Sequence, residues 1–324
     1  MALIALITLY SQIAPNFLTW SNLTTVLNQS VYVGLIAGGM TLVILAGEID
    51  VSVGSAAAFA GVVLALLLEE MAWPLALAAT VFLGTFIGVV AGWIRAVFLI
   101  PSFIVTLALF GALRGLALLL TDAIPQAPEP LSNSFFTFLG SGKILELPAA
   151  VLLLLVLFAA FWFVSTKTAF GTHVYAVGGN PEASHLVGVP VRRVRITLFA
   201  ITGGCAALSG IVLAAALGAG DPNVTQGLEF EVIAAVIVGG TSLYGGRGTM
   251  AGTVLGVLFI AVLGNGLVLM GIDPYANFVV RGLVVLAAVL VMSSTLRDHI
   301  RGVARRIAGR GRGRPTPRPT EEEQ

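Results

Sequence analysis

Long apolar segments follow one another along most of this chain, separated by short polar stretches. A helix needs about 20 apolar residues to cross a bilayer. We expect spanning helices near residues 30–47, 53–69, 74–94, 102–121, 147–165, 196–218, 250–270 and 275–295. Two shorter apolar runs, 2–14 and 230–243, bring the expectation to about ten crossings. The pattern therefore predicts an all-α polytopic membrane protein.

Composition supports this class. Of 324 residues, 57% are hydrophobic and 10% are charged, whereas a soluble domain has about 25% charged residues. So much apolar surface cannot be buried in one globular core. The run 2–14 is short for a crossing, so we expect a shortened first helix, or an N-terminus that has been truncated. Cys205 is the only cysteine, which excludes an intrachain disulfide.

The distribution of charge predicts an orientation. Basic residues dominate the loop 166–195 and the tail 296–324, whereas acidic residues dominate 122–147 and 219–231. Because cytoplasmic loops carry an excess of Lys and Arg, we expect 166–195 and both termini in the cytoplasm. This orientation needs four crossings between Arg195 and Leu296, which favours counting 230–243. We expect a transmembrane domain over 1–295 and a basic, partly disordered tail whose role the sequence leaves open.

The polar loop contains a miniature helix with its own start and stop signals. Asn180 is a good N-cap, Pro181 suits the first helical position, and Glu182 complements the positive helix start. Gly188 can adopt the left-handed conformation that ends a helix, and Pro190 prevents its continuation. A short capped helix on the basic side of a membrane protein is a suitable contact for a soluble partner.

Two glycine-rich polar segments interrupt the apolar pattern, at 46–55 and 238–249. Interrupted apolar segments in matching positions of two halves indicate an internal repeat that lines a substrate path. The halves here are the second to fifth and the seventh to tenth expected spans. Two ordinary cytoplasmic turns explain the pattern equally well. Whether 46–55 re-enters the membrane therefore stays open.

Few charged residues lie within the apolar segments. Ionisable groups inside a span are functional candidates, and Arg114 is the best placed. Glu48 and Asp50 flank an interruption, where they serve either as helix caps or as solute contacts. For Arg281 we favour a structural role. No nucleophile, oxyanion or cofactor set is present and the three histidines are scattered, so we expect neither an enzyme nor a metal site.

Four separated stretches resemble the permease subunits of ribose-type (simple-sugar) ABC importers. They are T-L-V-I-L-A-G-E-I-D-V-S-V-G-S (41–55), I-P-S-F-I-V-T-L-A-L-F-G-A-L-R-G-L-A-L-L-L-T (100–121), the G-x-N-P-E-A-x-x-x-x-G-V loop (178–189) and V-I-V-G-G-T-S-L-Y-G-G-R-G-T-x-x-G-T (236–253). They occur in order over nearly the whole chain. At Glu48 the chain departs from the family's commonest residue, glycine, so the resemblance does not specify the sugar.

The resemblance implies a type II importer fold, similar to that of cobalamin-type importers, in a subunit without catalysis or cofactor of its own. Implied partners are a second permease subunit, identical or paralogous, two ATP-binding subunits and an extracytoplasmic sugar-binding protein, with the loops 122–147 and 219–231 as its docking candidates. The implied coupling helix contains Asn180, Pro181, Glu182, Ala183, Leu186 and Gly188. Pathway or gate candidates are Glu48, Asp50, Ser52, Arg114, Thr241, Ser242, Tyr244 and Arg247. The alternative function is that of a secondary transporter or facilitator of a small solute.

Overall fold

The computed structural model describes residues 2–273, 276, 279–280, 282–283 and 286. Within them, seven helices are long and apolar enough to cross a membrane. These are α2 (Trp20–Leu45), α3 (Val53–Glu70), α4 (Trp73–Phe98), α5 (Ser102–Thr121), α7 (Ala149–Lys167), α10 (Val191–Leu217) and α12 (Met250–Leu269). Most of the expected span 275–295, with Arg281, and the whole tail 296–324 lie outside the described residues.

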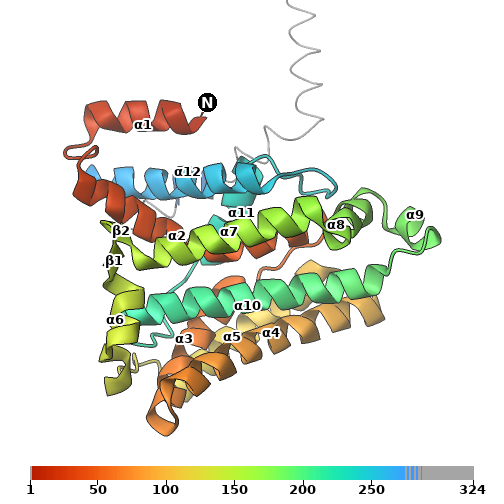
Figure 1. Cartoon of the computed structure of the whole chain (residues 1–324), viewed down its shortest axis with the longest axis horizontal. Helices are drawn as coiled ribbons and strands as arrows, with labels where there is room; N and C mark the ends of the chain where they lie inside the picture. The colour runs from red at the N-terminus through yellow and green to blue at the C-terminus, as the bar shows by residue number, and fades with distance from the viewer. Residues whose placement is uncertain (1, 274–275, 277–278, 281, 284–285, 287–324) are drawn as a thin grey trace, which may run out of the picture.

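Shorter elements complete the described part of the chain. They are α1 (Ala2–Ile13), η1 (Glu129–Ser132), α6 (Ser134–Ser141), β1 (Lys143–Ile144), β2 (Leu147–Pro148), α8 (Ala169–Gly179), α9 (Pro181–Leu186) and α11 (Leu228–Val238). The strands β1 and β2 form an antiparallel pair. Figure 1 shows α6 at one end of the long helices and α9 at the opposite end. We call these the α6 end and the α9 end.

Three expected boundaries were wrong. The helix α2 begins ten residues before the expected position 30. Thr19 caps its start, and polar residues of its first turns are buried against other parts of the chain. Asn22, for example, exchanges two hydrogen bonds of 2.9 and 2.8 Å with Asn265 of α12. The expected crossing 230–243 is replaced by the shorter α11, which begins at Leu228 and ends at Val238. The helix α10 begins at Val191, five residues earlier than expected.

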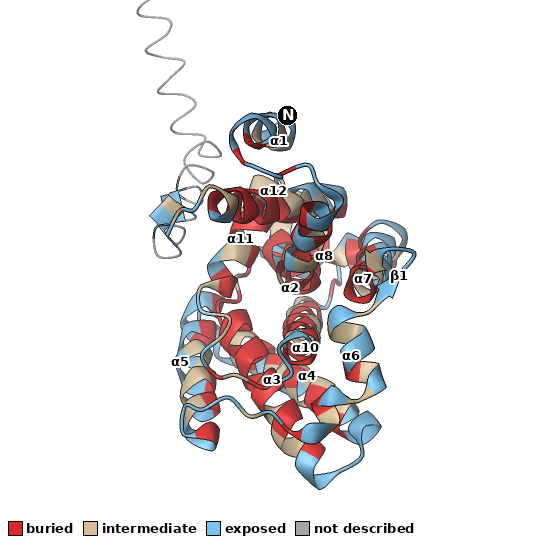
Figure 2. Cartoon of the chain, turned by 90° about the vertical axis from the view of Figure 1, so that its left-hand side faces the viewer, coloured by how far each residue is buried: buried red, intermediate tan, exposed pale blue. Residues whose placement is uncertain are grey.

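The long helices form two groups around two central helices. Figure 2 shows α3, α4, α5 and α10 together on one side, and α2, α11 and α12 together on the other. The helix α2 packs against α11 and α12, α10 packs against α3 and α4, and α2 and α10 pack against each other. One half of the chain begins with α2, α3 and α4, and the other with α10, α11 and α12. Each central helix thus contacts the second and third helices of the other half. This exchange is the arrangement that two related halves would produce.

The matching interruptions are not the two that the sequence suggested. Residues 46–52 follow the central helix α2, and 218–227 follow the central helix α10, so these two segments occupy equivalent places. The second segment meets the start of α3, which directly follows the first, because the Thr225 hydroxyl donates a 2.8 Å hydrogen bond to the Gly54 carbonyl. The segment 239–249 joins α11 to α12 and has a different position. We call 46–52 the inner segment and 218–227 the outer segment.

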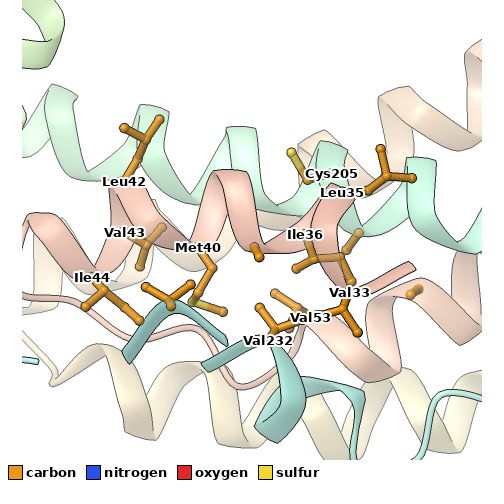
Figure 3. Close-up of a cluster of buried hydrophobic side chains, with 14 of the residues drawn as sticks. Val33, Leu35, Ile36, Met40, Leu42, Val43, Ile44, Val53, Cys205 and Val232 are labelled. Atoms are coloured by element: carbon orange, nitrogen blue, oxygen red, sulfur yellow. The ribbon is translucent and has the colours of Figure 1, made fainter. Parts of the chain in front are cut away.

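The buried side chains of α2 form the centre of the core. Figure 3 shows Val33, Ile36 and Met40 of α2 near Val53 of α3 and Val232 of α11. All five side chains are buried. Because lipid provides no hydrophobic drive between helices, close packing has to hold such a bundle together. The core therefore depends on the fit of α2 against both groups.

Glycines allow α4 and α10 to approach closely. A Cβ at Gly88 would overlap the carbonyl oxygen of Phe199, and a Cβ at Gly84 would lie 2.7 Å from the carbonyl oxygen of Gly203. Both obstacles are backbone atoms, which cannot rotate away as a side chain can. The fit requires glycine at these positions.

We therefore expect Gly88→Ala to lower the free energy of unfolding by about 1–3 kcal/mol, the usual range for overpacking. Thermal unfolding in detergent measures this change. The matched control is Gly111→Ala in α5, because a Cβ at Gly111 meets nothing within 4 Å. Equal stability of the two variants would contradict the close approach of α4 and α10.

Candidate functional site

The polar loop folds into an exposed arm at the α9 end. Thr168 caps α8 by accepting a hydrogen bond from Gly171 N, and Asn180 caps α9 in the same way from Ala183 N at 2.9 Å. The short helix begins at Pro181, and Gly188 has a φ of 87° just after it ends. These contacts confirm the miniature helix. The sequence did not predict α8 as a separate helix.

One face of α9 is anchored and the other is free. Ser184 is buried, and its hydroxyl donates a 2.8 Å hydrogen bond to the carbonyl of Asn180. Leu186 and Val187, by contrast, are 86% and 80% exposed. Such apolar exposure at the tip of a capped helix is typical of a protein-binding surface. Figure 1 shows the arm projecting beyond the ends of the long helices.

A cavity of about 730 Å³ lies beside the arm. Its walls come from α9, the last turn of α4 and the first turns of α10. Among the lining residues are Glu182, His185, Arg95, Arg193 and Arg195. The cavity is therefore strongly basic and opens next to the exposed tip of α9.

The arm contacts the segment 239–249 through α8. The Tyr175 hydroxyl donates a 2.9 Å hydrogen bond to the Gly248 carbonyl. Gly178 lies directly against the carbonyl of Leu45, and Gly246 N donates a 2.8 Å hydrogen bond to that carbonyl. The end of α2, the end of α8 and the segment 239–249 thus meet at one point.

Glu48 ties the inner segment to two other elements. Its carboxylate lies 2.9 Å from Nε of Arg95, on α4, and 2.7 Å from Nε of Arg195, on α10. The Glu48 side chain is only 3% exposed, and the two arginines are 16% and 13% exposed. Glu48 thus forms a buried ion cluster. The sequence interpretations of Glu48, a helix cap or a solute contact, did not include these two arginine partners.

Asp50 forms a local turn with Ser52; the N-cap position of α3 is Ser52, which makes no side-chain capping hydrogen bond. Oδ1 of Asp50 accepts hydrogen bonds from Ser52 N at 3.0 Å and from the Ser52 hydroxyl at 2.6 Å, just before α3 begins. Both side chains are buried. A carboxylate in this position also complements the positive helix start. Asp50 and Ser52 therefore organise the start of α3.

The inner segment runs inside the bundle, so it is not a turn on its surface. Of its residues, Glu48, Asp50, Val51 and Ser52 are all buried. Ser102 Oγ and Thr106 Oγ1 of α5 accept hydrogen bonds of 3.1 Å from Ile49 N and Val51 N. These bonds satisfy backbone groups that extended chain leaves unpaired. The segment 46–52 therefore packs inside the bundle.

Arg114 organises the outer segment. Its guanidinium donates hydrogen bonds to the carbonyls of Pro222 and Val224, and to the hydroxyl of Thr225 at 3.4 Å. Glu229, in the first turn of α11, is buried. The sequence made Arg114 a functional candidate but did not identify these partners. Arg114 shapes the segment where the two halves meet.

The remaining candidates lie near the α9 end. Thr241 is buried, and its hydroxyl has no hydrogen-bond partner among the described residues. The Ser242 hydroxyl accepts a 3.2 Å hydrogen bond from Tyr244 N. Tyr244 is 91% exposed, and Arg247 is also exposed. Gly47 and Gly245 bring this turn against the start of the inner segment.

The structure thus distributes the candidates over three places. Glu48 and the turn 241–247 lie near the arm, whereas Arg114 lies at the outer segment, and Asp50 and Ser52 lie between them at the start of α3. Sequence reasoning missed the partners Arg95, Arg195 and Tyr175. Arg195 lies in the basic loop 166–195, whose charge predicted only the orientation. Within the described ranges, no group of three His, Cys, Asp or Glu side chains could hold a metal ion.

Residues 22–289 match the model of a family described as "Branched-chain amino acid transport system / permease component". The chain is 48% identical to the probable ABC transporter permease protein YphD of Escherichia coli (strain K12) over 283 residues, which cover 87% of this chain and 84% of that protein. No solved structure matches.

The names of two further relatives refer to a transported sugar. The ribose import permease protein RbsC of Escherichia coli (strain K12) is 39% identical over 292 residues, covering 90% of this chain and 91% of RbsC. The xylose transport system permease protein XylH of the same strain is 34% identical over 341 aligned positions, covering 87% of each chain. The similarity therefore extends over nearly the full length of each protein.

The contacts of Arg114 lead to a prediction. Arg114→Gln removes the charge and the donors that hold 222–225, so we expect a loss of about 1.5–3 kcal/mol of stability, the range for hydrogen bonds to charged groups. Thermal unfolding in detergent measures it. Lys143→Gln, an exposed cation in β1, is the control. Unchanged stability of Arg114→Gln would contradict its role in holding the outer segment.

Proposed function

This chain belongs to the permease family described as the branched-chain amino acid transport system / permease component, and we propose that its solute is a monosaccharide or a related small polar solute. It is the membrane-spanning permease subunit of an ABC importer, as its relatives are ABC permeases over nearly their whole length. A permease is not an enzyme. The names of RbsC and XylH, which refer to ribose and xylose, support the choice of a sugar over an amino acid.

The observation that carries the mechanism is the arm. We propose that α9 is a coupling helix, formed by Asn180, Pro181, Glu182, Ala183, Leu186 and Gly188, which docks on a partner ATP-binding subunit. The exposed Leu186 and Val187 would provide the apolar contact, and the basic cavity beside α9 would receive acidic groups of that subunit. ATP would be bound by the partner, and the permease would need no cofactor of its own.

The contacts of the arm explain how docking could reach the solute path. Through Tyr175 and Gly178 the arm touches the segment 239–249 and the end of α2. Through α10 it continues into the group of helices that contains α3, α4 and α5. Displacement of α9 would therefore act on both helix groups. Rocking of the two groups between inward and outward openings is a common mechanism of alternating access.

The proposed path follows the inner and outer segments and the turn 241–247. Non-helical backbone at membrane depth is tolerated only where it is buried in protein or lines a cavity, and these segments contain most of it. Thr241, Ser242, Tyr244 and Arg247 would contribute to the gate at the α9 end. Asp50, Ser52 and Arg114 would shape the path without binding the solute directly.

We propose a multi-pass orientation in a bacterial inner membrane with the α9 end and both termini in the cytoplasm. The basic residues near the arm and the acids at 122–147 and 219–231 support it. A complex of two permease subunits, identical or paralogous, with two ATP-binding subunits would complete the importer. A sugar-binding protein would dock at the α6 end, where 122–147 and 219–231 come together through the Gln126–Gly220 bridge.

The alternative of a secondary transporter has less support. The named relatives are described as ABC or import permeases, and an exposed coupling helix has no function in an ion-driven carrier. The proposal is tested by purifying the tagged chain from its native membrane. Recovery of an ATP-binding subunit supports it, whereas a solitary chain, under conditions that preserve a known ABC complex, would favour the alternative.

The same complex tests the coupling helix. In liposomes, we expect ATP-dependent uptake of D-ribose or D-xylose delivered with the binding protein. Glu182→Lys, or Gly188→Val with its strained positive φ, should reduce uptake at least about tenfold, the effect of losing about 1.4 kcal/mol of coupling, while ATP hydrolysis continues. Membrane insertion should be unchanged. Normal coupled uptake in both variants would contradict the assignment of α9.

Orientation is tested by labelling single cysteines in a Cys205→Ala background. We expect His185→Cys to react only after a membrane-impermeant reagent gains access to the cytoplasm. Asn133→Cys, which precedes α6, should react in intact cells. Labelling in the reverse pattern would overturn the proposed orientation.

A further inference from the structure

We propose that Glu48 is a positioning residue that transmits displacement of the coupling helix to the inner segment. The inference rests on the proposed function, because it requires α9 to move with a partner. It goes beyond that function by identifying the contact through which the motion reaches residues 46–52. The relay runs from α9 through the start of α10 to Arg195, and from Arg195 to Glu48.

The first step of the relay is a firm connection between α9 and α10. Val189 N donates a 3.0 Å hydrogen bond to the Ser184 carbonyl, and Val194 N donates one of 3.0 Å to the Pro190 carbonyl. Ser184, Val189 and Val194 are all buried. The short connection after α9 therefore has little freedom, and the first turn of α10 moves when α9 moves.

The second step is the contact between Arg195 and Glu48, and its geometry suits a switch. Arg95 Nε donates hydrogen bonds of 2.9 and 3.1 Å to the two carboxylate oxygens. Arg195 Nε lies 2.7 Å from Oε1 but makes no aligned hydrogen bond. Its attraction to Glu48 is therefore Coulombic. Arg195 can withdraw while Glu48 keeps Arg95 as its partner, which avoids leaving a buried charge unpaired.

The third step is the inner segment itself. Glu48 N donates to the Val43 carbonyl at the end of α2, and Ile49 N and Val51 N donate to hydroxyls of α5. Hydroxyl acceptors can follow small displacements by rotation. A pull on Glu48 therefore shifts the segment between α2 and Asp50, at the start of α3. In the proposed relay the Glu48–Arg195 pair has two arrangements, one with Arg195 in contact and one with Arg195 withdrawn. An element with two discrete arrangements is the kind that couples distant sites.

The charge balance predicts different consequences for the two partners. One carboxylate faces two guanidinium groups, so Glu48→Gln leaves two like charges together in a poorly solvated place. Arg195→Gln leaves the Glu48–Arg95 pair intact and balanced. Arg195→Gln should therefore fold while it interrupts the relay. Because Arg195 also lines the proposed docking cavity, the relay is tested only in complexes that retain the ATP-binding subunit. This variant separates transmission from stability.

The experiment uses the whole complex with its ATP-binding partners, in a Cys205→Ala background. One reporter is His185→Cys on α9, and the other is Ile49→Cys in the inner segment. N-ethylmaleimide labelling is compared without nucleotide and with ATP plus vanadate. In the parent complex we expect the rates at both reporters to change about fivefold or more, the lower range of allosteric coupling.

With Arg195→Gln or Glu48→Gln, the change at Ile49→Cys should fall below about twofold, while that at His185→Cys persists. Lys167→Gln, an exposed cation at the end of α7, should preserve both responses. Co-purification of the ATP-binding subunit confirms assembly of each variant.

A full response at Ile49→Cys in assembled Arg195→Gln would overturn the relay while leaving the proposed function intact. Absence of any response in the parent complex, at both reporters, would instead contradict ATP-driven coupling itself. The two failures are therefore distinguishable.

Discussion

The fold depends on satisfying backbone hydrogen bonds where the chain is not helical inside an apolar environment. In lipid, an unpaired N–H or C=O group costs several kcal/mol, so spanning segments are normally continuous helices. This chain interrupts its bundle at 46–52 and 218–227, and side chains of one helix repair both interruptions. Ser102 and Thr106 accept from the first segment, and Arg114 donates to the second. The helix α5 is thus the shared support of both irregular segments.

Contacts near the two irregular segments also connect the two groups of helices. The starts of α3 and α11 meet at Gly54 and Thr225, and both carry buried acids, Asp50 and Glu229. Each acid complements a positive helix start. The central helices α2 and α10 each contact the opposite half of the chain. A displacement of either helix would therefore shift helices of both groups. This property suits a subunit whose movement is driven by partner proteins.

Much of the framework could be predicted from the pattern of residues. Apolar length located α3, α4, α5, α7 and α12 closely, because helix length is set by bilayer thickness. The caps at Asn180, Pro181 and Gly188 are local signals, so α9 was predicted correctly. The early start of α2 could not be predicted, because a polar residue such as Asn22 argues against a spanning helix. The partner that satisfies Asn22 inside the bundle, Asn265, is 243 residues away in the sequence. Composition also paired the wrong segments. The segment 218–227, which matches 46–52 in position, is less rich in glycine than 238–249.

The sequence by itself therefore determined the class of protein, most of its long helices, the short helix α9 and the family resemblance. These properties arise from composition and from interactions over a few residues. Only the tertiary structure decided that Glu48 binds Arg95 and Arg195, that Arg114 holds the outer segment, and that residues 46–52 lie inside the bundle. These contacts join groups on different helices. Their energies depend on burial and on distances that no local pattern specifies.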